Sequence, residues 1–150
     1  MASNKSIDKS KLLKRLNKDV KKIYADVVAK YNLEVDRVIT DPNEFANLGF
    51  VEQDIVDTGR LRDSKIIETQ GELSTRFSWD PVDPETGYHY ASAVFWGFNA
   101  YGGSKFVPGR PWSERAVYNH DPVNYFAARL KKAGYNAKVV RDDTRTIGLP

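Results

Sequence analysis

Residues 9–31 read KSKLLKRLNKDVKKIYADVVAKY, and this stretch decides what the rest of the chain must provide. Apolar side chains recur at steps of three and four residues, while lysines, an arginine and aspartates fill the opposite side. This period predicts an amphipathic helix that begins after Asp8 or Ser10 and ends at Asn32. The apolar side carries no Trp or Phe, which favours packing against a core over contact with a membrane. Its members are Leu13, Leu16, Val20, Ile23, Val27 and Tyr31.

The segment after this helix is acidic and mixed, and its order is the least predictable in the chain. Residues 41–43 (Asp-Pro-Asn) predict a turn, and residues 42–48 can form a short helix. Further on, Thr58 can cap a short helical turn in which Leu61 points inward. We therefore expect regular structure to resume near residue 58.

A β-hairpin is predicted next. Residues 65–69 and 72–79 read as two strands about a tight turn at Gln70-Gly71. Alternate residues of the second strand are apolar or Thr, which is typical of a half-buried antiparallel strand. The residues expected on its buried face are Leu73, Thr75, Phe77 and Trp79.

The rest of the chain alternates loops with aromatic and helical stretches. Residues 80–87 form a proline-punctuated loop, and residues 88–98 are dense in aromatic side chains, which marks a packing or binding surface. Glycine-rich and proline-rich turns occupy residues 101–112. A helix is expected from Pro111 to about Tyr118.

The C-terminal part carries clear helix boundaries. Asp121 and Pro122 are suited to cap and begin a last helix, and Gly134 is suited to end it. Its apolar side is expected to hold Val123, Phe126, Ala127 and Leu130. Residues 135–140 alternate like a closing strand, and residues 141–150 read as a polar tail.

Composition bounds the class of protein. The chain has 150 residues, 41% of them hydrophobic and 29% charged, which suits one packed domain. It has no cysteine and only two histidines, so disulfide frameworks, thiolate zinc sites and cysteine nucleophiles are excluded. No apolar run approaches the roughly 20 residues of a membrane span, and the N-terminus lacks the apolar core of a secretory signal. We expect a soluble protein that acts where it is made.

The charge is distributed in blocks. The net charge is +3, but residues 1–32 carry a formal +6 and residues 33–60 carry −5. Residues 61–100 carry −3 and residues 101–150 carry +5. Basic ends around an acidic middle suit a nucleic-acid surface, subunits that meet basic face to acidic face, or simply solvated helix faces.

No stretch carries a catalytic or metal-binding motif. His89 and His120 lie far apart in the sequence and outside an H-E-x-x-H frame. The acidic residues of the 80–87 loop do not have the spacing of a calcium loop. Gly102-Gly103-Ser104 fits neither a nucleophile elbow nor a phosphate loop. A hydrolase with dispersed carboxylates leaves no spacing signature, so it stays a third alternative. We expect no enzyme activity, no metal and no cofactor.

Three stretches in order nevertheless form a pattern. They are Val56-Asp57-Thr58-Gly59-Arg60-Leu61-Arg62-x-Ser64, Tyr90-Ala91-x-x-Val94-x-x-Gly97, and Gly109-Arg110-Pro111-Trp112 leading to Ala116. This order resembles the neck proteins of long-tailed bacteriophages, the head-tail joining or tail-completion family typified by the gene-ten product of an HK-type lambdoid phage. Trp112 stands where the family has Phe, and Phe95-Trp96 replaces its Glu-aromatic pair.

The resemblance implies a fold and a role. The fold is α+β, with a long N-terminal helix and a C-terminal helix packed on one face of a small antiparallel sheet, and with a long glycine-rich loop. Residues 1–141 would form the single domain and residues 142–150 a tail. The role is that of a structural virion protein, a ring in the neck that joins the capsid connector to the tail and lets DNA pass.

The resemblance also assigns residues. Its motifs hold a scaffold and are not catalytic, and the loop at residues 99–110 is expected to reach a neighbouring subunit or ring. The scaffold set is Val56, Asp57, Thr58, Gly59, Leu61, Ser64, Tyr90, Ala91, Val94, Gly97, Arg110, Pro111, Trp112 and Ala116. The loop set is Tyr101, Gly102, Gly103, Ser104, Lys105 and Phe106.

The expected partners follow from this role. They are further copies of the chain, the connector or head-closure proteins, and the tail-terminator or tail-tube proteins, with DNA in passage and with no membrane or small-molecule substrate. The protein would be made in the host cytoplasm and reside in the virion. The chief alternative is a nucleic-acid-binding module that uses the basic N-terminal helix. The residues for that alternative are Lys14, Arg15, Lys18, Lys21 and Lys22.

Overall fold

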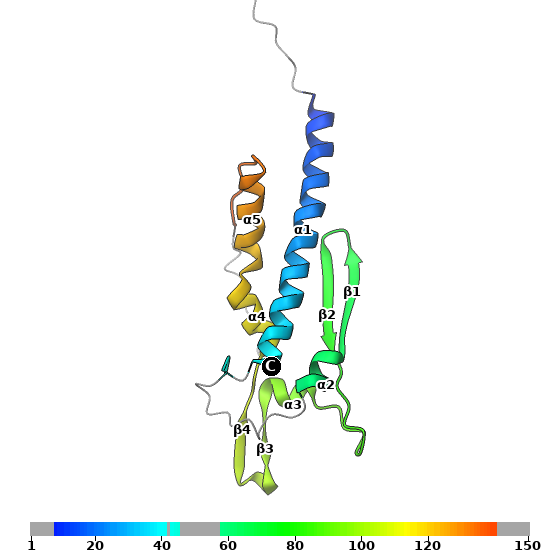
Figure 1. Ribbon diagram of the computed structural model, residues 1–150, viewed down its shortest axis with the longest axis vertical. Helices are drawn as coiled ribbons and strands as arrows, with labels where there is room; N and C mark the ends of the chain where they lie inside the picture. Colours follow the sequence, from blue (N-terminus) through cyan, green and yellow to red (C-terminus); the bar gives the residue numbers. More distant parts are fainter. Residues whose placement is uncertain (1–7, 42, 46–57, 141–150) are drawn as a thin grey trace, which may run out of the picture. The chain divides into compact units, whose positions relative to one another are not determined.

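A computed structural model describes residues 8–41, 43–45 and 58–140, and it has the predicted α+β class (Figure 1). The helices are α1 (Lys9–Thr40), α2 (Thr58–Asp63), α3 (Ala91–Trp96), α4 (Trp112–His120) and α5 (Pro122–Lys132), with a 3-10 turn η3 (Tyr101–Gly103). The strands are β1 (Lys65–Gly71), β2 (Ser74–Trp79), β3 (Gly97–Ala100) and β4 (Lys105–Pro108). They form two separate antiparallel hairpins, β1-β2 and β3-β4.

The chain divides into two compact units. One unit, called here the basic unit, comprises residues 1–27 and 121–150; the other, called the acidic unit, comprises residues 28–120. The single domain at residues 1–141 and the tail at residues 142–150 stay predictions, and residues 141–150 lie outside the described part.

Helix α1 runs eight residues beyond its predicted end, from Asn32 to Thr40. The sequence predicted a helix that stops at Asn32, whereas α1 continues to Thr40. Val35, Val38 and Ile39 of this extension are at most 4% exposed. Burial of such side chains is worth about 1.5–3 kcal/mol each, which outweighs the weak preference of Asn for a helix end.

The extension of α1 is anchored in the core of the acidic unit. At its end, Thr40 Oγ1 donates a hydrogen bond to the carbonyl of Asp36 at 2.9 Å. The turn predicted at residues 41–43 follows, and in it the Asn43 backbone amide donates a hydrogen bond to Asp41 Oδ1 at 2.9 Å. The helix predicted at residues 42–48 falls largely outside the described residues. Further along, α2 forms where predicted and Leu61 is 2% exposed.

The first hairpin turns later than the sequence predicted. Strand pairs run from Lys65 with Trp79 to Gly71 with Ser74, so the turn consists of residues 72–73 and not of Gln70-Gly71. Leu73, expected on the buried face, lies in this turn and is 51% exposed. The face lies against α1, where the rings of Tyr31 and Phe77 meet edge to face at 4.8 Å.

The basic unit is a pair of helices, the first half of α1 and α5. Ile23 and Val27 of α1 and Ala127 of α5 are buried. The predicted boundaries of α5 are confirmed: Asp121 caps its start, Pro122 follows, and Gly134 has a φ of 98° just beyond its end.

Three expectations for the basic unit are wrong. Val123, expected on the apolar side of α5, is 56% exposed, and Leu13, expected on the apolar side of α1, is 58% exposed. Residues 135–140 form no strand. The described neighbours of this segment within the unit are helices, so it has no sheet edge with which to pair. Instead the Tyr135 hydroxyl donates a hydrogen bond to Asp19 at 2.7 Å.

Leu61→Ala tests whether the core at the end of α1 sustains the fold. Removing a side chain that is 2% exposed should lower the free energy of unfolding by about 2–5 kcal/mol in urea denaturation. Leu73→Ala is the matched control, because this leucine is half exposed; it should change the value by about 0.5 kcal/mol or less. Equal losses in the two variants would contradict the proposed core.

Candidate interaction surface

The three motif stretches, far apart in the sequence, meet in one hydrophobic core of the acidic unit. Leu61 comes from α2, Tyr90 and Val94 from the start and body of α3, and Trp112 and Ala116 from α4. All five are 5% exposed or less. They pack with Val35, Val38, Ile39 and Phe45. The motif residues thus form a scaffold within one unit.

A continuous series of aromatic rings crosses this core. Trp112 lies at its centre, edge to face with Trp79 at 5.8 Å and with Phe95 at 5.2 Å. On one side Trp79 stacks on Phe77, and on the other Phe95 meets Trp96 at 4.8 Å. The series therefore links the first hairpin to α3 and ends at Trp96, which is 56% exposed.

Two glycines allow the second hairpin to fold back on α3. A Cβ atom on Gly109 would lie 2.3 Å from the carbonyl oxygen of Phe95, and one on Gly97 would lie 2.7 Å from that of Val107. Gly97 also has a φ of 92°, which side chains rarely tolerate. The Arg110 amide then donates to the Val94 carbonyl at 2.8 Å. The base of β3-β4 is thereby fixed to the motif core.

The remaining scaffold residues have structural positions. Ser64 Oγ donates to the Leu61 carbonyl at 2.8 Å, just past the end of α2. Gly59 lies in α2, and Ala91 begins α3, partly buried against the core. Arg110 is 8% exposed, and burial lowers the pKa of its guanidinium. Pro111 precedes α4, which begins at Trp112. Thr58 begins α2, while Val56 and Asp57 lie outside the described residues.

The predicted loop is largely a hairpin. Residues 99–110 include the end of β3, η3 and β4, with Ala100 paired to Lys105. Tyr101 begins η3, and Gly102 and Gly103 follow with φ values of 66° and 91°. Ser104 and Lys105 are exposed.

An apolar surface lies at the base of this hairpin. Phe106 is 62% exposed, and its ring edge lies 3.1 Å from where a Cβ of Gly97 would be. Trp96, directly before Gly97, is also more than half exposed. Exposed aromatic side chains at a fixed position are typical of protein interfaces. The sequence predicted the loop but not its strand pairing, which depends on the close approach of Gly97 and Gly109.

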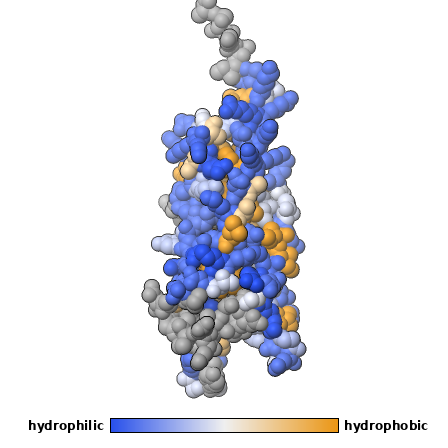
Figure 2. Space-filling view, viewed as in Figure 1, coloured by the Kyte–Doolittle hydropathy of each residue, from blue (hydrophilic) through white to orange (hydrophobic). Residues whose placement is uncertain are grey.

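Figure 2 shows a second group of apolar side chains on a largely hydrophilic face, over the β1-β2 hairpin. Ile66 and Ile67 of β1 are 51% and 45% exposed. Because β1 and β2 pair only with each other among the described strands, each keeps one unpaired edge.

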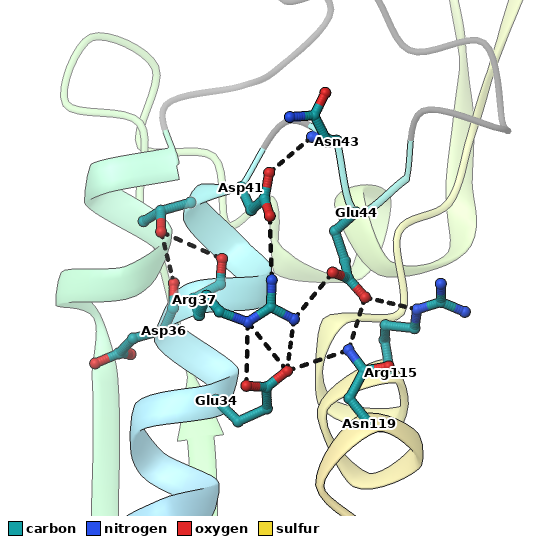
Figure 3. Close-up of polar contacts among 9 residues, drawn as sticks. Glu34, Asp36, Arg37, Asp41, Asn43, Glu44, Arg115 and Asn119 are labelled. Atoms are coloured by element: carbon teal, nitrogen blue, oxygen red, sulfur yellow. Dashed lines mark hydrogen bonds and ion pairs between the residues drawn. The ribbon is translucent and has the colours of Figure 1, made fainter.

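A polar network fastens the end of α1 to α4 (Figure 3). Arg37 bonds Glu34 at 2.6 Å and Glu44 at 3.0 Å. Glu44 also accepts from Arg115 at 2.8 Å and from Asn119 at 2.7 Å. The hydrogen bonds from Asn119 and Arg115 hold the pKa of Glu44 down to about 2. Sequence spacing could have indicated the Glu34 and Arg37 pair, but not the partners on α4.

His89 and the acidic residues of the 80–87 loop, which the sequence raised as candidate metal ligands, form local hydrogen bonds and an ion pair. His89 Nδ1 lies 2.6 Å from Asp80 Oδ1, and both side chains are more than 60% exposed. Asp83 Oδ1 accepts from the amides of Glu85 and Thr86, as in a common Asx turn. Within the described ranges no group of three or more His, Cys, Asp or Glu could hold a metal ion. Nor does any described helix combine the length and apolarity of a membrane span.

Glu44 predicts how stability depends on pH. Its folded pKa of about 2 is below the ordinary value of about 4.3, so the network stabilises the fold fully above about pH 5. This contribution is lost as the pH falls toward about 2. Glu44→Gln should lower the free energy of unfolding at pH 7 by about 1–3 kcal/mol and flatten its dependence on pH between 5 and 3 in urea denaturation. Glu114→Gln, on the exposed side of α4, should change neither; a wild-type pH profile for Glu44→Gln would contradict the role of the network.

Gly97→Ala tests the close approach of the second hairpin. Backbone strain and the contact with the Val107 carbonyl should together lower the free energy of unfolding by roughly 2–5 kcal/mol. Gly87→Ala is the control, since its φ of 70° is also positive but nothing lies within 4 Å of its Cβ position. It should cost only the strain, roughly 1–2 kcal/mol in the same denaturation experiment. Equal costs would show that the approach is not tight.

Comparison with known proteins provides no function to transfer. No protein-family model, curated protein or solved structure matches the chain.

Proposed function

We propose that this protein is a structural virion protein of a tailed phage, which forms a ring in the neck that joins the capsid connector to the tail. The observation that carries this proposal is that the three motif stretches meet in one hydrophobic core. Leu61, Val94 and Trp112, one from each stretch, are buried in the same cluster. Motifs that hold a scaffold and no reactive side chain suit an assembly protein better than an enzyme. The β3-β4 hairpin is fixed to this core, and the aromatic side chains of Trp96 and Phe106 at the hairpin are exposed. Exposed aromatic side chains are suited to a surface that binds another protein.

The distribution of charge also supports a ring. A closed ring needs heterologous interfaces, in which two different patches of one subunit meet. The basic unit carries fourteen basic and six acidic residues, a formal +8. The acidic unit carries nine basic and fourteen acidic residues, a formal −5. Opposite charges on two units of one chain favour head-to-tail contact between copies.

In such a ring the carboxylates of the acidic middle that do not contact a neighbouring copy would face the lumen, where they would keep passing DNA from adhering. The basic ends would serve contacts between subunits. The ring's neighbours would be connector or head-closure proteins on one side and tail-terminator or tail-tube proteins on the other.

A nucleic-acid-binding module remains the alternative, and one observation favours it. Lys14, Lys18 and Lys22 are all exposed on α1, within the unit of formal charge +8. Single-strand binding by stacking would also need aromatic side chains among these lysines, and the sequence has none between residues 9 and 23. Light scattering with negative-stain imaging separates the two: rings support assembly, whereas a monomer that binds duplex DNA with a steep salt dependence supports the alternative.

Deletion of Gly102–Lys105 tests the hairpin as a joining element. These residues lie beyond the β3-β4 base, and the Cβ positions of Gly102 and Gly103 contact nothing within 4 Å. The deletion should therefore leave the circular dichroism spectrum and melting temperature of the isolated protein near those of wild type. In a phage complementation assay it should abolish the joining of heads to tails.

The double replacement Ser104→Gly and Lys105→Gly, which makes all of residues 102–105 glycine, provides the control. This variant keeps the length of the loop, so it separates the loss of reach from the loss of side-chain contacts. A normal yield of phage from the deletion would contradict the role of the hairpin.

A further inference from the structure

The basic unit contains a cavity between its two helices. It has a volume of about 260 Å³ and is open to solvent. Ile23 of α1, which is 5% exposed, lies in its wall. The polar lining residues are Asp19 and Lys22 from α1 and Arg129 and Lys132 from α5, with Ala133 beside them.

The charges of this cavity are only partly balanced. Arg129 forms an ion pair with Asp26 at 2.9 Å, and Asp19 forms one with Arg15 at 3.8 Å and accepts the hydrogen bond from Tyr135. Lys22 and Lys132 have no hydrogen-bond or ion-pair partner among the described residues. With the ion-pair partners included, the cations Arg15, Lys22, Arg129 and Lys132 against Asp19 and Asp26 leave a net charge of +2 at a site that two helices hold in place. The cavity is therefore suited to an anion.

We propose that this cavity binds a glutamate side chain from the acidic unit of a second copy of the chain. The acidic unit has an excess of carboxylates, and three of its exposed ones, Glu68, Glu85 and Glu114, have no partner among the described residues. One carboxylate between Lys22 and Lys132 would pair with both lysines and halve the excess positive charge of the site. Asp19 lines the same cavity and disfavours the greater charge of a phosphate group. This inference rests on the proposed function, since it names the contact by which copies would meet.

Charge reversal with complementation tests the contact. The pocket variant carries Lys22→Glu and Lys132→Glu, and the acid variant carries Glu68→Lys, Glu85→Lys and Glu114→Lys. Each alone should self-associate at least about tenfold more weakly than wild type in analytical ultracentrifugation, because like charges then meet. A mixture of the two should associate, because both possible contacts between the two variants join opposite charges, whereas each variant alone brings like charges together. Wild-type association should weaken with added salt.

The control variant carries Lys14→Glu and Lys138→Glu. It makes the same change in net charge on the same unit, at exposed residues that do not line the cavity. It should associate much more strongly than the pocket variant. If control and pocket variants lose association equally, the effect is one of total charge and the proposed contact is wrong.

The remaining outcomes separate this contact from the ring. Rings that form equally well from the pocket variant would overturn the contact and leave the proposed function intact. Pairs or open chains that require Lys22 and Lys132 would support the contact and contradict a closed ring.

Two further outcomes would assign the cavity to another occupant. If the double variants Lys22→Gln/Lys132→Gln and Asp142→Asn/Asp143→Asn destabilise the monomer to the same extent, the cavity binds the chain's own carboxylates. If the wild type and the control variant bind duplex DNA and the pocket variant does not, the cavity binds phosphate. Either result would overturn the proposal.

Discussion

The packing of Trp112 is the interaction on which the acidic unit depends. This ring is 4% exposed and meets both Trp79 of the first hairpin and Phe95 of α3, while its backbone begins α4. Its indole nitrogen has no hydrogen-bond partner among the described residues, so its contribution comes from ring packing and burial. Removing it would separate three elements at once, which explains why the motif stretches converge there.

The second hairpin takes its position from this core. Gly97 and Gly109 let its two strands approach α3 more closely than any side chain would permit, and the Arg110 amide bonds the Val94 carbonyl. This close approach of the backbone and the Arg110–Val94 hydrogen bond fix the segments that carry the exposed rings of Trp96 and Phe106. A joining surface held in this way loses little conformational entropy on binding, which favours assembly.

Polar contacts serve different purposes in the two units. In the acidic unit Glu44 is satisfied by side chains from α1 and α4, so its charge stabilises the fold. In the basic unit Lys22 and Lys132 face one cavity without such partners among the described residues. Charges satisfied within the chain contribute to stability, whereas unbalanced charges beside a cavity are available to another molecule.

The sequence by itself determined the presence of the long N-terminal helix and of the first hairpin, the caps of α5, the inward position of Leu61 and the separation of charge, because each depends on local period or composition. It misplaced the end of α1 and the turn of the first hairpin, and it predicted a strand at residues 135–140 that does not form. Those features depend on which neighbours are available for burial or pairing. Only the tertiary structure decided that Glu44 meets Arg115 and Asn119, that two glycines meet backbone carbonyls, and that Lys22 and Lys132 share a cavity. The polar contacts and the shared cavity bring together residues that are 71 to 110 positions apart, which leave no spacing for a sequence to reveal. The glycine contacts join nearer residues, but they depend on a close approach of backbone atoms that no side-chain pattern records.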